Sequence, residues 1–222
     1  MHQKQKQVQQ QTRIPLSNRV ISKPLYHLIL GLTLCWGFGV NWWMVQNIHP
    51  TAFINYSVLL FLGFYFGSFI LGCSLFQGSS NALVSFIGFN LVVVPLGLVV
   101  NIATDGVATP LITYAMELTA LVTVTMMCLS MLFPGFFKSI IGKLALVGLT
   151  LVAVELVYIF VLGGSNILIH AGMVVTFAGY IGYYWVHACE QEPTLDNAID
   201  AAAYLYMSII NLFLRILEIL KR

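Results

Sequence analysis

The sequence predicts an all-α integral membrane protein with seven transmembrane helices. Hydrophobic residues make up 59% of the chain, and its mean hydropathy is +0.89. Charged residues make up only 8%, whereas soluble domains hold about 25%. Ten basic and eight acidic residues cannot cover the surface of a soluble protein of 222 residues, so lipid must solvate the exterior. A lipid bilayer is therefore the expected surroundings of this chain.

Seven apolar runs are each close to the length of about 20 residues that crosses a bilayer. The breaks between them carry turn-forming residues, in chain order "NIHPT", "FQGSSN", "NIATDGVATP", "FPGFFKS", "LGGSN" and "CEQEPTLDN". No break is long enough to hold a further domain. The predicted spans are Tyr26–Val45, Tyr56–Leu75, Ala82–Val100, Pro110–Leu132, Leu144–Leu162, Ile167–His187 and Ile199–Leu220. Small residues in the second span, Gly63, Gly67 and Gly72, are expected to permit close helix packing.

The N-terminal residues 1–22 are predicted to form a polar cytoplasmic tail, and residues 23–222 the membrane domain. The first twenty residues, "MHQKQKQVQQQTRIPLSNRV", have no apolar core, which is typical of a disordered tail rather than a signal peptide. Basic residues favour the cytoplasmic side of a membrane. They gather in this tail and, as Lys138 and Lys143, in the loop after the fourth span, while the three loops assigned outside contain none.

This pattern predicts a cytoplasmic N-terminus, and the short loops suggest a bacterial cytoplasmic membrane. Lys221 and Arg222 then fall outside, which a six-span arrangement would avoid. We prefer seven spans because the last apolar segment is as long as the others.

No catalytic, metal-binding or cofactor-binding set emerges from the sequence. It contains no HExxH, no GxSxG and no phosphate-binding loop, so we expect neither an enzyme nor a cofactor. No nucleic-acid partner is expected. The cysteines have no metal-type spacing, and isolated histidines near span ends are more often interfacial than ligands. These residues are Cys35, Cys73, Cys128 and Cys189, and His27, His49, His170 and His187.

A row of polar residues runs along the last span. Its members are spaced by three or four residues, so they project within a sector less than about 90° wide. Such a row cannot face acyl chains, which predicts that the last helix is buried among its neighbours. The row serves either as interhelical hydrogen bonding or as the lining of a pathway, with Asp200 as a possible helix cap. Its members are Asp200, Tyr204, Ser208, Asn211, Arg215 and Glu218.

Two further acids lie inside spans, Glu117 in the fourth and Glu155 in the fifth. Each lies about as far from the outer end of its span as Arg215 does in the last span. Two acids and one base at a common depth predict pairing. We expect at least one glutamate to pair with Arg215, which leaves the other as a candidate proton-binding group.

The C-terminal sequence "NAIDAAAYLYMSIINLFLRILEIL" resembles the signature of the Bax inhibitor-1, or transmembrane Bax inhibitor motif, family. Weaker similarity covers "FAGYIGYYWVHA" and "MCLSMLFPGFFKSIIGKLALVGL". This resemblance implies six helices around a central seventh. It also implies the activities attributed to the family, which are a pH-sensitive calcium leak, modulation of stress or cell death, and interaction with a membrane protease in bacteria.

The chain departs from this family where the resemblance would place a pair of aspartates. Those positions are Tyr184 and Ser208, so two coupled carboxyl groups are missing. Two functions therefore remain open. One is an ion leak of calcium or protons; the other is a non-conducting regulatory or binding protein that modulates stress responses or a membrane protease. The candidate pathway or gate residues are Glu117, Glu155, Ser208, Asn211, Arg215 and Tyr184.

Overall fold

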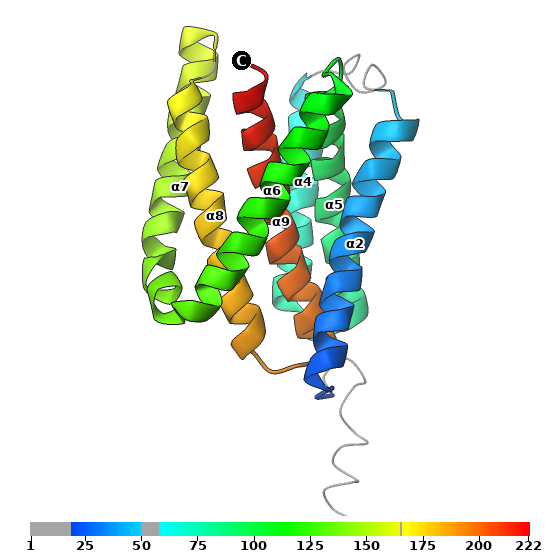
Figure 1. The fold of residues 1–222 in the computed structure, drawn as a ribbon. Coiled ribbons are helices and arrows are strands. Elements are labelled where there is room, and N and C mark those ends of the chain that lie inside the picture. Colours follow the sequence, from blue (N-terminus) through cyan, green and yellow to red (C-terminus); the bar gives the residue numbers. More distant parts are fainter. Residues whose placement is uncertain (1–18, 50–57, 165) are drawn as a thin grey trace, which may run out of the picture. The chain divides into compact units, whose positions relative to one another are not determined.

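The computed structural model describes residues 19–49, 58–164 and 166–222, and within them it contains seven long α-helices (Figure 1). All seven are long and apolar enough to cross a membrane, as the sequence predicts. Parts of the predicted tail and of the second span, residues 1–18 and 56–57, lie outside the described residues. The helices are α2 (Lys23–Asn47), α4 (Val58–Gly78), α5 (Ala82–Thr104), α6 (Thr109–Leu132), α7 (Pro134–Leu162), α8 (Ile167–Glu190) and α9 (Leu195–Leu220).

The turn-forming residues between the apolar runs set the ends of several of these helices. Asn81 accepts a hydrogen bond from the backbone N–H of Leu83 at 3.0 Å and so caps α5. Gly163 ends α7 in the left-handed conformation with φ 67°, which glycine adopts without steric cost. Thr194 caps α9 by accepting from the backbone N–H of Asn197 at 3.1 Å.

The chain divides into two compact units. The first contains α2, α4, α5 as far as Val99, and α9 as far as Ala203. Within it α2 and α5 lie side by side, and Gly97 of α5 leaves room for Asn41 and Met44 of α2. The short segment before α2 joins the start of α9 through an antiparallel bridge between Val20 and Thr194.

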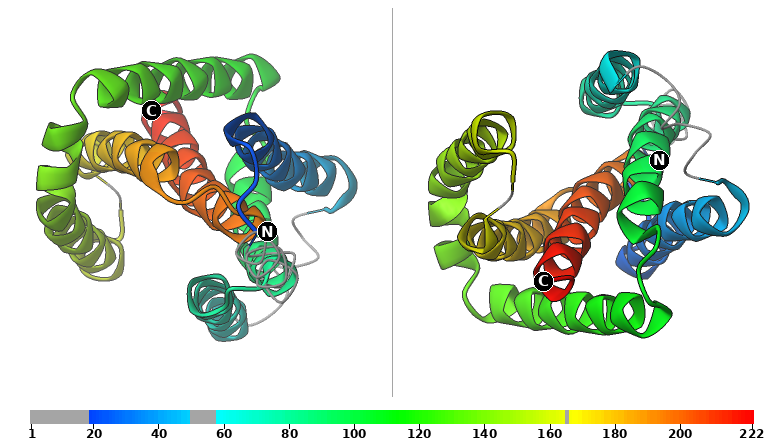
Figure 2. Two further views of the ribbon diagram at one scale, coloured as in Figure 1. Left: turned by 90° about the horizontal axis from the view of Figure 1, so that it is seen from below. Right: turned by 90° about the horizontal axis from the view of Figure 1, so that it is seen from above.

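The second unit contains the end of α5, then α6, α7 and α8, and α9 from Tyr204 onward. Here α7 and α8 run side by side in both figures (Figures 1 and 2). Glycines of α8 permit this approach. A Cβ atom at Gly179 would lie 2.8 Å from Leu144, and one at Gly182 would overlap the ring of Phe137.

One predicted helix start and two predicted glycine contacts were wrong, and Asp200 does not cap the last helix. The fifth span begins at Pro134 rather than Leu144, because proline is favoured at the first position of a helix; Lys138 and Lys143 therefore lie on α7. The last span begins at Leu195, so Asp200 lies in the second turn and Thr194 takes the capping role. Gly72 does meet Gly88 of α5, where an added Cβ would lie 2.6 Å from the Gly88 carbonyl oxygen. Gly63 and Gly67 face open space.

The predicted burial of the last helix is confirmed. Between Leu195 and Leu220 every residue is buried or partly buried and none is exposed, whereas each of the other six helices has exposed residues. The placement of six helices around a central seventh stays a prediction.

Candidate functional site

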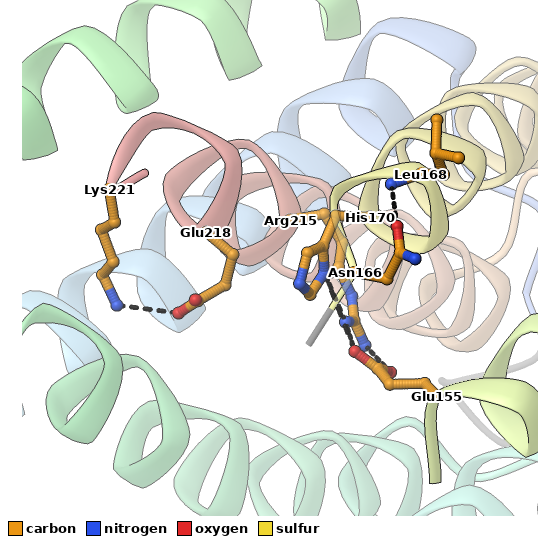
Figure 3. Close-up of polar contacts among 7 residues, drawn as sticks. All are labelled: Glu155, Asn166, Leu168, His170, Arg215, Glu218 and Lys221. Atoms are coloured by element: carbon orange, nitrogen blue, oxygen red, sulfur yellow. Dashed lines mark hydrogen bonds and ion pairs between the residues drawn. The ribbon is translucent and has the colours of Figure 1, made fainter. Parts of the chain in front are cut away.

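The centre of the candidate site is an ion pair within the second unit, between Arg215 of α9 and Glu155 of α7. The Nη2 atom of Arg215 donates to Oε2 of Glu155 at 2.8 Å, and Nη1 donates to Oε1 (Figure 3). Both side chains are largely buried, with 19% of Arg215 and 14% of Glu155 exposed. Two parallel hydrogen bonds fix the planar guanidinium against the planar carboxylate, which is the strongest geometry available to such a pair.

His170, in the first turns of α8, completes a cluster of three ionisable residues. Its Nδ1 atom lies 3.2 Å from Nη1 of Arg215 and 3.7 Å from Oε1 of Glu155. Because arginine can only donate, Nδ1 is the acceptor, and the neutral ring carries its proton on Nε2. That Nε2 atom is buried and has no hydrogen-bond partner among the described residues. His170 is only 3% exposed, so almost all of the residue is covered by other parts of the protein.

A second contact connects α7 to the start of α8, one turn before His170. Asn166 donates from Nδ2 to the hydroxyl of Tyr158 at 3.3 Å. Its Oδ1 atom accepts from the backbone N–H of Leu168 at 2.9 Å and caps the start of α8 (Figure 3). Tyr158 lies one turn beyond Glu155 on α7, so this cap fixes the first turn of α8 beside the carboxylate.

The cluster carries no net charge when His170 is neutral. Glu155 supplies one negative charge and Arg215 one positive charge, which offsets part of the cost of removing each from water. A proton on His170 would leave the cluster with a net positive charge. It would also turn Nδ1 into a donor that faces the donors of Arg215. The cluster can therefore exist in two electrostatically distinct states that differ by one proton.

The predicted pairing of Arg215 with a glutamate is confirmed for Glu155 and does not extend to Glu117. Glu117 is exposed on α6. Its carboxyl group has no hydrogen-bond or ion-pair partner among the residues that the structure describes. Glu117 therefore does not contact Arg215, although the two residues were predicted to lie at a similar depth in their spans.

Ser208 and Asn211 bond within α9 itself. Ser208 is 3% exposed, and its hydroxyl donates to the backbone oxygen of Tyr204 at 2.9 Å. Asn211 donates from Nδ2 to the backbone oxygen of Met207 at 2.8 Å. Both hydrogen bonds therefore run to the preceding turn of α9 and not to a neighbouring helix.

Tyr184 of α8 stacks on Tyr204 of α9, with ring centroids 4.7 Å apart and planes at 12°. Tyr180 also stacks on Tyr184, with ring centroids 5.9 Å apart and planes at 23°. Where the resemblance would place paired aspartates, Tyr184 therefore takes part in an uncharged aromatic contact with the neighbouring helix. This contact joins α8 to α9 without a charged group.

A second polar contact involves the first turn of α9, within the first unit. The hydroxyl of Ser85 on α5 donates to Oδ1 of Asp196 at 2.7 Å, with Ser85 0% and Asp196 5% exposed. Asp200, one turn further along, belongs to the polar row of the sequence. Sequence reasoning missed Asp196 because it lies before the predicted start of the last span.

Sequence reasoning also missed His170, which was interpreted as an interfacial histidine. A signal for it exists in the chain. His170 lies near the start of α8, Arg215 near the end of α9 and Glu155 in the last third of α7, and these positions fall at one end of three consecutive helices. Counting residues from the ends of the three spans would therefore have predicted that His170 lies at the same depth in the membrane as Arg215 and Glu155.

A protein-family model described as "Inhibitor of apoptosis-promoting Bax1" matches residues 17–222, nearly the whole chain. No curated protein sequence and no solved structure gives a significant match.

Proposed function

Since this chain belongs to the Bax inhibitor-1 family, we propose that it forms a pH-sensitive ion leak pathway across the membrane. In this proposal protons are the carried ion, and Glu155, His170 and Arg215 form the gate. The observation that carries the proposal is the contact of the His170 imidazole with a buried ion pair. Histidine changes its charge near physiological pH, so it can couple acidity to this pair.

Acidification opens the gate through the chemistry of the His170 ring. A protonated imidazole has two donor nitrogens, so Nδ1 can no longer accept from Arg215. The new N–H instead turns to Oε1 of Glu155, at 3.7 Å, and competes with the guanidinium for that oxygen. The charged groups that act on His170 are Glu155 on α7, with Arg215, Glu218 and Arg222 on α9. Weakening the bond between α7 and α9 loosens the helices around the buried His170 ring.

The donor set supports protons over calcium. Calcium takes six to eight oxygen ligands and prefers several carboxylates. Both oxygens of Glu155 are already bonded to Arg215. The described residues contain no group of three or more His, Cys, Asp or Glu side chains placed to hold a metal ion. The Nε2–H of His170, which has no hydrogen-bond partner among the described residues, needs no such cage to pass on a proton.

Flux measurements in liposomes test this function. The purified protein is reconstituted with an internal pH dye in one set and a calcium indicator in a second set, and each is followed between about pH 5 and pH 8. We expect proton flux that rises with acidity and no calcium signal. Glu155→Gln should raise proton flux at neutral pH because the ion pair is broken. Asp105→Asn, which changes an exposed acid in the turn between α5 and α6, should leave the flux unchanged.

A second candidate function is a non-conducting regulatory or binding protein that acts in stress responses or on a membrane protease. The stacking of Tyr184 on Tyr204 favours it, because an aromatic contact between α8 and α9 does not open with pH. If folded protein carries neither protons nor calcium at any pH, the ion leak is excluded and only this second function remains. Neither candidate assigns an enzymatic activity.

We further propose a cytoplasmic N-terminus and an origin in a bacterial cytoplasmic membrane. The basic residues of the N-terminal tail support this orientation. With seven spans the C-terminus then lies outside. In the variant Lys221→Cys, the new cysteine should react with a membrane-impermeant maleimide added to intact cells. Labelling that occurs only after lysis would show that the C-terminus lies inside the cell and would contradict the proposed orientation.

A further inference from the structure

Glu117 is an exposed carboxyl group within a membrane-spanning helix. It is the ninth residue of α6 (Thr109–Leu132), so it lies about 12 Å from the start of the helix and about 22 Å from its end. A hydrocarbon core about 30 Å thick contains a residue at this position. Its carboxyl group has no partner among the described residues, and acyl chains offer none. An acid there needs a hydrogen-bonding group from another molecule.

The face of α6 around Glu117 is suited to close contact with another helix. Seven residues project within about 100° of one another, and all seven are exposed. Several have short side chains, which let two helix backbones approach closely in a membrane. The hydroxyl of Thr113 is already bonded to the backbone oxygen of Thr109, at 3.1 Å, so Glu117 is the unsatisfied polar group of this face. The α6 face consists of Thr113, Glu117, Ala120, Leu121, Val124, Cys128 and Met131.

We propose that a second copy of this chain covers the α6 face, forming a parallel two-fold dimer in which the two Glu117 carboxyl groups share a proton. Copies inserted in one orientation bring Glu117 to the same depth in both. A two-fold contact places each residue against the same surface of its mate. One protonated and one ionised carboxyl group form a charge-assisted hydrogen bond, so the face is complementary to itself.

A basic residue is a poorer match for Glu117. Arg215 is occupied by Glu155. Lys138 and Lys143 are exposed basic residues of the adjoining helix. Their distances from the turn between α6 and α7 differ from that of Glu117 by about eleven and about six residues, or roughly 16 Å and 9 Å. A copy in the same orientation therefore presents its own Glu117 at the required depth, and Lys143 at another.

Cys128 provides a direct test because it lies on the same face. It follows Glu117 by eleven residues, or three turns, and it is exposed. In a dimer through the α6 face the two Cys128 side chains approach each other. The experiment uses the full chain in liposomes with Cys128 as its single cysteine and a copper–phenanthroline oxidant. A matched control retains only Cys35, which is exposed on α2.

We expect a disulfide-linked dimer with Cys128 and none with Cys35 under the same conditions. Glu117→Gln should keep the cross-link, since an amide still bonds to its mate. Glu117→Leu should lower the yield by about tenfold, the loss expected for one hydrogen bond between helices in a membrane. Circular dichroism and gel filtration of each variant verify that it is folded.

Three outcomes would overturn the proposal. The first is equal cross-linking of Glu117→Leu and the parent chain. The second is a monomer in liposomes by single-molecule photobleaching, with no Cys128 cross-link. The third is cross-linking of Cys35 at the same rate as Cys128, which would indicate random collision. The dimer does not rest on the proposed leak, because the gate residues Glu155, His170 and Arg215 lie on α7, α8 and α9 and the α6 face contains none of them.

Discussion

The Arg215 guanidinium on α9 donates two hydrogen bonds to the Glu155 carboxylate on α7, and the His170 ring of α8 contacts both partners. Three consecutive helices of the second unit are thus joined through one cluster of ionisable groups. In a membrane, where no water replaces a lost partner, such a cluster has consequences for both stability and the response to pH.

Breaking the Arg215–Glu155 pair should destabilise the protein strongly. Arg215→Leu or Glu155→Leu alone leaves an uncompensated buried charge, at a cost of about 3–5 kcal/mol in the free energy of unfolding. The double variant, which removes both charges, should recover most of that loss. Equilibrium unfolding in mixed micelles with increasing sodium dodecyl sulfate measures these differences. Lys221→Ala is the control, because it removes an exposed pair with Glu218 worth about 1 kcal/mol or less.

Replacing His170 should flatten the response to pH. His170→Phe keeps an aromatic ring but cannot bind a proton, so proton flux in liposomes should no longer rise between about pH 8 and pH 5. His187→Phe is the control, because His187 is exposed at the end of α8 and stacks on Tyr183. An undiminished rise of flux with acidity in His170→Phe would exclude this residue as the gate.

The stacked tyrosines should couple energetically across α8 and α9. A double-mutant cycle of Tyr184→Leu and Tyr204→Leu should give a coupling of about 0.5–1.5 kcal/mol, the range for aromatic pairs. Tyr184→Phe keeps the ring and should preserve the contact. Additive effects of the two leucine substitutions on the unfolding free energy would show that the rings do not hold the helices together.

Glycines of α4 should differ sharply in their tolerance of alanine. Gly72→Ala would place a Cβ 2.6 Å from the Gly88 carbonyl oxygen, so α4 and α5 must separate, at a cost of about 1–3 kcal/mol. Gly63→Ala and Gly67→Ala meet open space and should be neutral or stabilise the helix by up to about 1 kcal/mol. The thermal unfolding of the three variants distinguishes these effects. Similar losses at all three positions would contradict the close approach at Gly72.

Part of the site could be predicted because depth in a membrane follows from residue counting. The distance of Arg215 and Glu155 from their span ends placed them at one level, and their pairing is confirmed. The same counting placed Glu117 at that level, yet its side chain is exposed on α6. Depth fixes one coordinate only. The rotation of a helix about its axis, and the identity of its neighbour, decide which of two acids at one level meets the base.

The sequence by itself determined the number of spans, most of their ends to within a few residues, and the burial of the last helix. These depend on local properties: apolar length, turn residues and the three-to-four spacing of polar groups along α9. The tertiary structure alone decided that His170 joins Glu155 and Arg215, that Tyr184 stacks on Tyr204, and that α7 begins at Pro134. Arg215 lies 45 positions from His170 and 60 from Glu155 in the sequence, so these contacts depend on how the helices pack. An amphipathic pattern specifies which face of a helix is buried, but it does not specify which side chain of another helix that face will contact.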